Sequence, residues 1–487
     1  MLRGVIVSGL VSVALLACGG APAHIEADGG EPDAEFTPDA NVADSRSADT
    51  SAVDAGPPRA DVPFIACNDA LNDVYKTPPN LPPMTLASRG DVIRCAHDVD
   101  WSLTDVQARI SSKGVQTPAT TGTSLYRVEF RTTRGDGTAG TSTARVYLPK
   151  KPRALPLPVI VIGHPTDGIA PSCTPSKDLS SNNELALPWA ALGYAVIVPD
   201  YSGLGNEGVQ SYLDNRDQAY SLLDGARALR KLLSPGALNP QVLAVGYSQG
   251  GGAVLSAQAL AGQYGCDGKL QAAIVFAPEW PSRLNSFGYV DMLRNPGDLT
   301  ISAGIGKPVV AEMRQYAYFA NHAGLNHAGD AFPAAKAAGM SNAIATLCQT
   351  PLGGYVQGNA LHLGDLIDDS LRTGLLSCID GNACSGDAKD YFDYLQNNFV
   401  TADKSGAPVL FIQGLADQIM VPYQEAACNL DKLSKEGVNA QVCADFSATH
   451  TSVVGRNADF AIAWGQAVLS GGARPSCSSF GMPPCSP

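Results

Sequence analysis

The chain has 487 residues, of which 45% are hydrophobic, and this is enough to form a large buried core. Its formal net charge is −13, and residues 1–60 contribute much of it, with nine acidic side chains against three arginines. The mildly acidic remainder argues against a nucleic-acid partner and offers no electrostatic attraction to anionic lipid.

The first residues have the pattern of an export signal. Arg3 precedes the apolar run GVIVSGLVSVALLA. The run ends in LLAC at Cys18, which resembles the lipobox of bacterial lipoproteins, in which the cysteine is acylated. An ordinary signal peptide that ends near a cysteine is the alternative. We therefore expect a lipoprotein signal peptide at 1–17 and an exported protein anchored to a membrane through Cys18. Gly19 stands where an inner-membrane retention signal is usually Asp, which favours the outer membrane or the cell surface.

A linker is predicted next. Residues 19–62 are rich in Ala, Asp, Gly and Pro and hold almost no large apolar side chains. Such a segment cannot bury enough surface to order itself. Together with Cys18 it is predicted to be an acidic, disordered linker over 18–62 that holds the folded body away from the membrane.

Eleven further cysteines favour disulfides in an exported protein. Proximity in the sequence suggests Cys67–Cys95, Cys378–Cys384, Cys428–Cys443 and Cys477–Cys485. The sequence cannot fix the connectivity, and an odd count leaves one thiol over. No cysteine or histidine cluster has the spacing of a zinc site, so no metal and no cofactor is expected.

The body of the chain alternates between strand and helix patterns. In residues 63–280 the predicted strands are 125–133, 141–149, 157–165, 194–203, 241–245 and 270–278, with a helix at 218–233. Residues 281–400 show no strong strands and are too long for a connection, so they are predicted to be an inserted helical cap or lid, with helices near 308–320 and 330–348. Residues 401–487 have predicted strands at 407–417 and 438–446, a helix at 456–470 and a cysteine-rich tail.

This alternation predicts an α/β fold with an open, mostly parallel sheet and helices on both faces. Residues 63–280 and 401–487 are predicted to form the two parts of one core, and residues 281–400 are predicted to form the cap. Chemistry in such sheets collects at the carboxyl ends of the strands.

One motif points to nucleophilic catalysis. The segment GYSQG at 246–250 fits G-x-S-x-G, between a predicted strand and a helix rich in small residues. A sharp turn in this setting lifts the Oγ of Ser248 off the sheet. The serine then needs a base that takes its proton and donors that stabilise an oxyanion.

The partners of Ser248 should follow later strands. Asp417 closes the run VLFIQGLAD, and His450 lies in FSATHTSVV after the next strand. The chain order Ser248, Asp417, His450 is that of α/β-hydrolases. In this arrangement the histidine is the general base, and the aspartate holds its tautomer and steadies the imidazolium.

Other interpretations of these residues exist. Asp417 could be only a helix N-cap, and Asp403 and Asp445 are rival acids. Of the other histidines, His164 ends a predicted strand and could line the site. The remaining ones lie in the linker, before the sheet or in the cap, and they are His24, His97, His322, His327 and His362.

The oxyanion hole needs two backbone N–H groups. The first is expected from Gln249, which follows the nucleophile at the start of a helix. The second should come from the loop after the strand 157–165, in which Thr166 and Asp167 lie.

Several segments of the chain resemble, in the same order, the secretory lipase family of fungi and bacteria, the relatives of Candida lipase A. They are DGIAPSCTPS, VPDYSGLG, LLDGARAL, GYSQGG and GLADQIMVP, followed by the His450 loop. The likeness covers roughly residues 65–475. It implies an α/β-hydrolase with an inserted helical lid that needs no metal and hydrolyses acylglycerols and other carboxylic esters. In that family an Asp six residues before a Cys-x-Pro-Ser segment gives its N–H to the oxyanion, and Asp167 stands six residues before Cys173. Asp200 and Asp224 also match the family pattern, and we interpret both as structural.

Two departures limit the resemblance. The lipobox and acidic linker are not typical of the secreted fungal members, and residues 281–400 show little match, so acyl-chain preference cannot be transferred. The expected function is a surface-tethered serine esterase or lipase whose partner is a small-molecule or lipid ester. The alternatives are an acyltransferase or a serine peptidase on the same fold, and a non-catalytic binding lipoprotein.

Overall fold

The structure is a computed structural model, and it describes residues 57–206, 208–265, 268–279, 288–296, 306–360, 363–420 and 425–477. The predicted signal peptide 1–17, the anchor residue Cys18 and most of the predicted linker lie outside these residues. At the end of the predicted linker, the Arg59 N–H donates to Ser234 Oγ at 2.7 Å and Ala60 is fully buried. The last residues of that segment therefore pack on the folded body.

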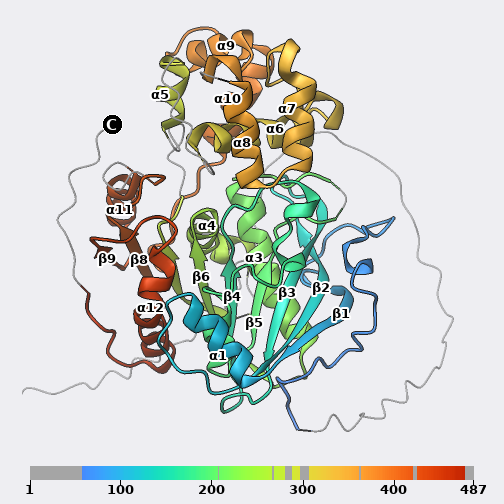
Figure 1. The fold of residues 1–487 in the computed structure, drawn as a ribbon, viewed down its shortest axis with the longest axis vertical. Helices are drawn as coiled ribbons and strands as arrows, with labels where there is room; N and C mark the ends of the chain where they lie inside the picture. The colour runs from blue at the N-terminus through green and yellow to red at the C-terminus, as the bar shows by residue number, and fades with distance from the viewer. Residues whose placement is uncertain are drawn as a thin grey trace, which may run out of the picture. The chain divides into compact units, whose positions relative to one another are not determined.

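The described strands form one mixed sheet (Figure 1). Its strands, in spatial order, are β1 (Val92–Trp101), β2 (Thr123–Thr133), β3 (Ala139–Pro149), β5 (Val196–Pro199), β4 (Leu157–Gly163), β6 (Leu238–Tyr247), β7 (Lys269–Phe276), β8 (Val409–Gly414) and β9 (Ala440–Asp445). The pairs from β1 to β5 are antiparallel, and those from β5 to β9 are parallel. The predicted α/β class with a mostly parallel sheet is confirmed, and β2 and β3 correspond to the predicted strands 125–133 and 141–149. Strand β1 was not predicted.

Helices cover both faces of this sheet (Figure 1). One face packs against α1 (Leu103–Ser112), α2 (Leu187–Ala191) and α12 (Val453–Ser470), and the other against α3 (Asn215–Leu232), α4 (Gln249–Tyr264) and α11 (Glu425–Lys435). Every residue of β4 and of β8 is buried. The near-continuous apolar runs of these central strands follow from burial on both faces.

Six α-helices are described between β7 and β8 in the chain, where the cap was predicted. They are α5 (Tyr289–Arg294), α6 (Lys307–His322), α7 (Ala334–Thr346), α8 (Gln349–Asn359), α9 (Asp369–Ile379) and α10 (Gly386–Asn397). Figure 1 shows them gathered in one group. We call the described residues of this insertion, from Gly288 to Asn398, the cap.

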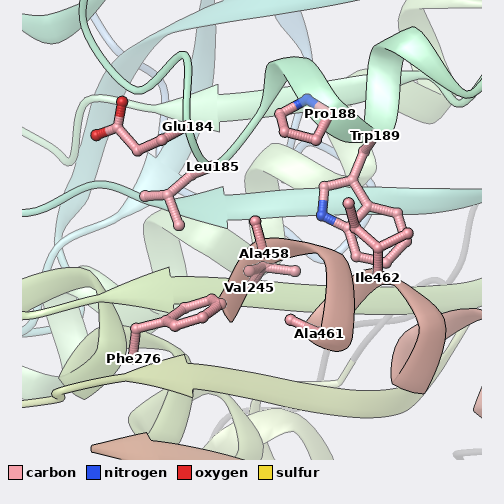
Figure 2. A pocket seen from close by; sticks show the side chains of 9 residues that line it. All are labelled: Glu184, Leu185, Pro188, Trp189, Val245, Phe276, Ala458, Ala461 and Ile462. Carbon is pink, nitrogen blue, oxygen red and sulfur yellow. The ribbon is translucent and has the colours of Figure 1, made fainter. Parts of the chain in front are cut away.

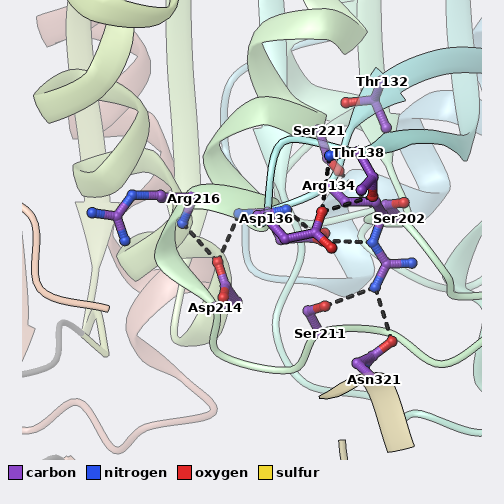
Figure 3. Close-up of polar contacts among 12 residues, drawn as sticks. Thr132, Arg134, Asp136, Thr138, Ser202, Ser211, Asp214, Arg216, Ser221 and Asn321 are labelled. Carbon is purple, nitrogen blue, oxygen red and sulfur yellow. Dashed lines mark hydrogen bonds and ion pairs between the residues drawn. The ribbon is translucent and has the colours of Figure 1, made fainter. Parts of the chain in front are cut away.

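Polar contacts join the cap to the core. The Asn215 N–H donates to Asn398 Oδ1 at 2.7 Å, and Asn215 Nδ2 donates to the Asn398 carbonyl at 2.6 Å. In Figure 3, Arg134 from the β2–β3 turn reaches Ser211 at 2.7 Å and Asn321 of α6 at 3.2 Å. The C-terminal end of the cap and the end of α6 are therefore hydrogen-bonded to the core.

Four disulfides are formed among the described cysteines, and they are Cys67–Cys95, Cys173–Cys348, Cys378–Cys384 and Cys443–Cys477. The first and third were predicted. The predicted pairs Cys428–Cys443 and Cys477–Cys485 are wrong, because Cys443 is bonded to Cys477. The physical reason is that the chain after α12 returns along the edge strand β9, where Gln441 Nε2 donates to the Pro475 carbonyl at 2.9 Å. In the described part of the chain, we find no helix of the length and apolarity needed to span a membrane.

Candidate active site

Three predicted site residues follow three parallel strands. Ser248 comes directly after β6, Asp417 lies three residues after β8, and His450 lies in the loop between β9 and α12. The carboxyl ends of parallel strands meet at the same edge of the sheet. The order of the strands therefore brings together side chains that are up to 202 residues apart in the sequence.

The turn that carries Ser248 is tight and strained. Ser248 has φ 54° and ψ −120°, which L-residues rarely adopt. Glycine is required around it because backbone segments touch. A Cβ on Gly246 would lie 2.1 Å from the Gly250 carbonyl oxygen, and one on Gly250 would lie 2.0 Å from the Gly163 carbonyl oxygen. The G-x-S-x-G pattern thus reflects close contact between the ends of β4 and β6 and the start of α4.

The three side chains form a continuous hydrogen-bonded chain. His450 Nε2 lies 3.0 Å from Ser248 Oγ, and His450 Nδ1 lies 2.7 Å from Asp417 Oδ2. All three residues are at most 6% exposed. A carboxylate on one ring nitrogen and a hydroxyl on the other is the arrangement in which an imidazole takes a proton from the hydroxyl.

The position of Asp417 is fixed by further donors. Its Oδ1 accepts the N–H groups of Ile419 and Met420 at 2.8 and 2.9 Å. The rival acids are occupied elsewhere: Asp445 pairs with Arg456, whose hydrogen bond lowers the pKa of that carboxyl to about 2, and Asp403 caps the turn at Ser405. Among the three acids weighed from the sequence, only Asp417 contacts His450.

The predicted oxyanion donors are the residue that follows Ser248 and a residue of the loop after β4. Gln249 is the first residue of α4, and its backbone N–H has no acceptor among the described residues. Its side chain is held on both sides, by Thr166 Oγ1 at 3.1 Å and by Gln218 Oε1 at 2.7 Å. Thr166 also contacts the hydroxyl of Tyr212 at 2.7 Å. The start of α4 is thereby attached to the loop after β4, which carries Asp167.

Asp167 is half-buried, but its Oδ2 is enclosed and has no hydrogen-bond partner among the described residues. Loss of solvation raises the pKa of its carboxyl to about 6. Its carbonyl accepts the Gln349 N–H at 2.9 Å. Its own backbone N–H has no acceptor in the described parts of the chain, so it is free to bind a developing negative charge.

The other candidates have structural contacts. His164 is 1% exposed, with Nδ1 2.6 Å from the Pro165 carbonyl and Nε2 3.2 Å from the Asp200 carbonyl. His327 pairs with Asp330 on the surface. His97 contacts Asp100, and His322 contacts Tyr318, so neither contact involves Ser248. His24 and His362 lie outside the described residues. Asp200 and Asp224 accept hydrogen bonds from buried groups, as the structural interpretation predicted.

One residue at the site was missed from the sequence. Tyr247 precedes the nucleophile, and its hydroxyl donates to the His450 carbonyl at 2.9 Å. Its ring lies 5.0 Å from the imidazole, centroid to centroid. The only sequence signal was an aromatic residue at the first variable position of the motif.

The small cavity in Figure 2 is not part of this site. It is lined mainly by apolar side chains of α2, β6, β7 and α12, among them Val245, Phe276 and Ile462. Ser248, Asp417 and His450 do not line it. Within the described ranges, no group of three or more His, Cys, Asp or Glu side chains could hold a metal ion.

Comparisons with known proteins bear on the fold and on one segment. Residues 180–279, which include Ser248, match the family model described as secretory lipase. Among curated proteins no match is found. The fold is similar to that of LipA, a rice cell wall degrading esterase from Xanthomonas oryzae, with 18% identity, a TM-score of 0.58, and coverage of 78% of this chain and 97% of LipA. It is also similar to lipase A of Candida antarctica in its closed state, with 18% identity, a TM-score of 0.59, and coverage of 80% and 84%.

The fold defined by the sheet and its helices is that of an α/β-hydrolase. The resemblance to secretory lipases, predicted from motifs spread along the chain, is confirmed by the match over residues 180–279. The match over residues 180–279 indicates a carboxylic ester hydrolase of the lipase and esterase type.

Proposed function

We propose that the chain hydrolyses carboxylic esters through Ser248, His450 and Asp417, with Gln249 and Asp167 as oxyanion donors. The observation that carries this proposal is the unbroken chain of contacts from Asp417 through His450 to Ser248, at 2.7 and 3.0 Å. Both distances are within the range that proton transfer requires.

In this mechanism Ser248 Oγ attacks the ester carbonyl carbon while His450 Nε2 takes the hydroxyl proton. The carbonyl oxygen becomes an oxyanion and accepts the N–H groups of Gln249 and Asp167. When the carbon–oxygen bond to the alcohol breaks, His450 returns the proton to the leaving alcohol, and an acyl-enzyme on Ser248 remains. Water then attacks this acyl-enzyme and gives its proton to His450; the bond between the acyl carbon and Ser248 Oγ breaks, Oγ takes the proton back from His450, and the carboxylic acid is released.

The test uses p-nitrophenyl esters of graded acyl-chain length. We expect the purified protein to cleave them and Ser248→Ala to lose about 10⁴-fold in kcat with its fold intact. A serine-directed organophosphate should label the wild type and not the variant. Near-wild-type hydrolysis by Ser248→Ala would end the proposal.

The same assay separates the alternatives. Cleavage of amides alone would favour a serine peptidase, and preferred transfer of the acyl group to an added alcohol would favour an acyltransferase. Neither labelling nor turnover would favour a non-catalytic binding lipoprotein. A step in rate above substrate micelle formation would favour a lipase over an esterase.

We also propose export and lipid anchoring through Cys18. The support is the lipobox-like LLAC sequence after an apolar run, together with disulfides in the folded body, which are typical of exported proteins. Incorporation of labelled palmitate should occur in the wild type and be lost in Cys18→Ala. Label retained by that variant would exclude this anchor.

A further inference from the structure

The loop that carries Asp167 is attached to the cap by two contacts. The first is the Cys173–Cys348 disulfide, which joins the end of this loop to the residue that precedes α8. The second is the hydrogen bond from the Gln349 N–H to the Asp167 carbonyl at 2.9 Å. Cys348 and Gln349 are neighbours in the sequence, so two adjacent residues of the cap hold the loop.

The backbone next to Asp167 lies directly against this disulfide. Gly168 has φ +117°, a conformation that L side chains rarely adopt. A Cβ at Gly168 would lie 3.0 Å from Cys348 Cα, 3.1 Å from Cys173 Sγ and 3.1 Å from the Gln349 nitrogen. The path of the chain through Asp167 and Gly168 is therefore shaped by atoms of the cap.

This attachment matters because an oxyanion donor acts only at the correct distance. Removing one donor from such a hole typically costs about 10²- to 10³-fold in kcat, and displacement by about 1 Å can cost about 10²-fold. The Gln249 N–H is fixed by the start of α4, within the core. The Asp167 N–H lies on a loop whose carbonyl and whose neighbouring glycine both contact the cap.

We propose that the Cys173–Cys348 disulfide positions the Asp167 N–H for oxyanion stabilisation, so that the cap is a supporting part of the oxyanion hole. This inference rests on the proposed function, in which Asp167 is an oxyanion donor. Cys173 and Cys348 are positioning residues, because they act through Asp167. The alternative is that the disulfide only stabilises the fold, as a cross-link over a long loop would.

The disulfide is bordered by a surface pocket through which a small reductant can approach it. The pocket has a volume of about 240 Å³ and is lined among others by Asp167, Ser172, Cys173, Cys348 and Gln349. A small dithiol such as dithiothreitol would reduce the bond to two thiols, taking up two electrons and two protons, while the dithiol is oxidised to its cyclic disulfide. Oxidation would restore the bond.

The experiment compares two paired substitutions, each of which removes one disulfide of the cap. Cys173→Ser with Cys348→Ser removes the proposed support, and Cys378→Ser with Cys384→Ser removes a bond that lies wholly within the cap. For p-nitrophenyl butyrate we expect the first variant to lose at least about ten-fold in kcat, with KM within about two-fold. The inhibition constant of an aryl boronic acid, whose serine adduct resembles the tetrahedral intermediate, should rise by a similar factor. The control variant should keep kcat within about two-fold.

Two further measurements apply where the first variant does not fold. Gly168→Ala retains the disulfide but strains the loop. It should also lower kcat, with little change in KM. Wild type reduced with dithiothreitol below its unfolding temperature should lose activity and regain it on oxidation.

The inference would be overturned if either the Cys173→Ser/Cys348→Ser variant or the reduced wild type is folded and keeps its activity. The criterion is that both kcat and the boronate inhibition constant stay within two-fold of those of the oxidised wild type. This holds even if the melting temperature falls, because a lower melting temperature alone is the structural effect. Failure of the wild type to cleave any ester would instead overturn the proposed function, so the two failures are distinguishable.

Discussion

The turn at Ser248 and the loop at Asp167 both belong to the proposed site, yet different kinds of contact hold them. The turn is fixed by backbone packing at the edge of the sheet, where a Cβ on Gly250 would meet the Gly163 carbonyl at 2.0 Å. The loop is held by contacts with the cap, through Cys348 and Gln349. The position of Ser248 therefore depends on the core, whereas the loop that carries the proposed oxyanion donor contacts an insertion far away in the sequence.

The largest expected effect tests the turn. Gly250→Ala would place a methyl group 2.0 Å from the Gly163 carbonyl oxygen and 2.6 Å from the His164 carbonyl oxygen, so backbone must shift. We expect the free energy of unfolding to fall by about 3 kcal/mol or more, with loss of ester hydrolysis. Urea unfolding followed by circular dichroism measures the change.

The matched control is Gly354→Ala. Gly354 is exposed in α8, and a Cβ there meets nothing within 4 Å. Alanine is favoured over glycine in a helix, so this variant should be as stable as the wild type or more stable by up to about 1 kcal/mol. Equal stability of Gly250→Ala and wild type would contradict the packing described for the turn.

The second prediction concerns the loop and its dependence on pH. Burial raises the pKa of Asp167 to about 6, well above its ordinary value, while His164 opposes the shift and Glu184, Asp178 and Asp200 add to it. The folded protein therefore binds the proton more tightly than the unfolded chain does. The penalty for burying the ionised carboxylate is absent below about pH 4 and complete above about pH 6, so this residue makes stability fall as pH rises through that window.

Asp167→Asn removes this titration. Two pKa units correspond to about 3 kcal/mol, which is an upper estimate for the effect. We expect the stability of the variant relative to wild type to increase between pH 4 and pH 6, measured by urea unfolding at each pH. A difference that is constant over this range would show that the carboxyl does not titrate as described.

The smallest expected effect joins the turn to the histidine loop. Tyr247→Phe keeps the ring beside His450 and removes the hydroxyl that donates to the His450 carbonyl. Loss of one such hydrogen bond should cost about 1 kcal/mol of stability, and we expect kcat to fall several-fold because the imidazole is held less firmly. Steady-state kinetics with a p-nitrophenyl ester measure this, and unchanged kcat would show that the hydroxyl does not position His450.

Much of the sheet and of the site geometry was predictable because the signals are local. The apolar runs of β4 and β8 indicate burial on both faces, and glycine spacing around Ser248 indicates the sharp turn. Asp417 and His450 follow strands, and parallel strands end at one edge, so chain order was enough to predict that they meet Ser248. These predictions need only the pattern of each segment and a general rule of the fold.

The rest depends on contacts that leave no periodic signal. Cys173 and Cys348 are 175 residues apart, and nothing near either residue indicates the other. Cys443 bonds to Cys477 because the tail returns along β9, and proximity in sequence favoured the wrong partner. Tyr247 contacts His450 only through the folded turn, so its part in the site could not be derived from the motif.

The position of the cap between β7 and β8 has a consequence for how the chain folds. These two strands are hydrogen-bonded neighbours, yet all the cap helices lie between Phe276 and Val409. Closing a long flexible segment costs conformational entropy, but this cost grows only slowly with length, and a segment that is already compact adds little. During synthesis, the sheet can acquire β8 and β9 only after the whole insertion has emerged. Asp417 and His450 are therefore the last parts of the proposed site to be synthesised, and Ser248 leaves the ribosome long before its proposed base.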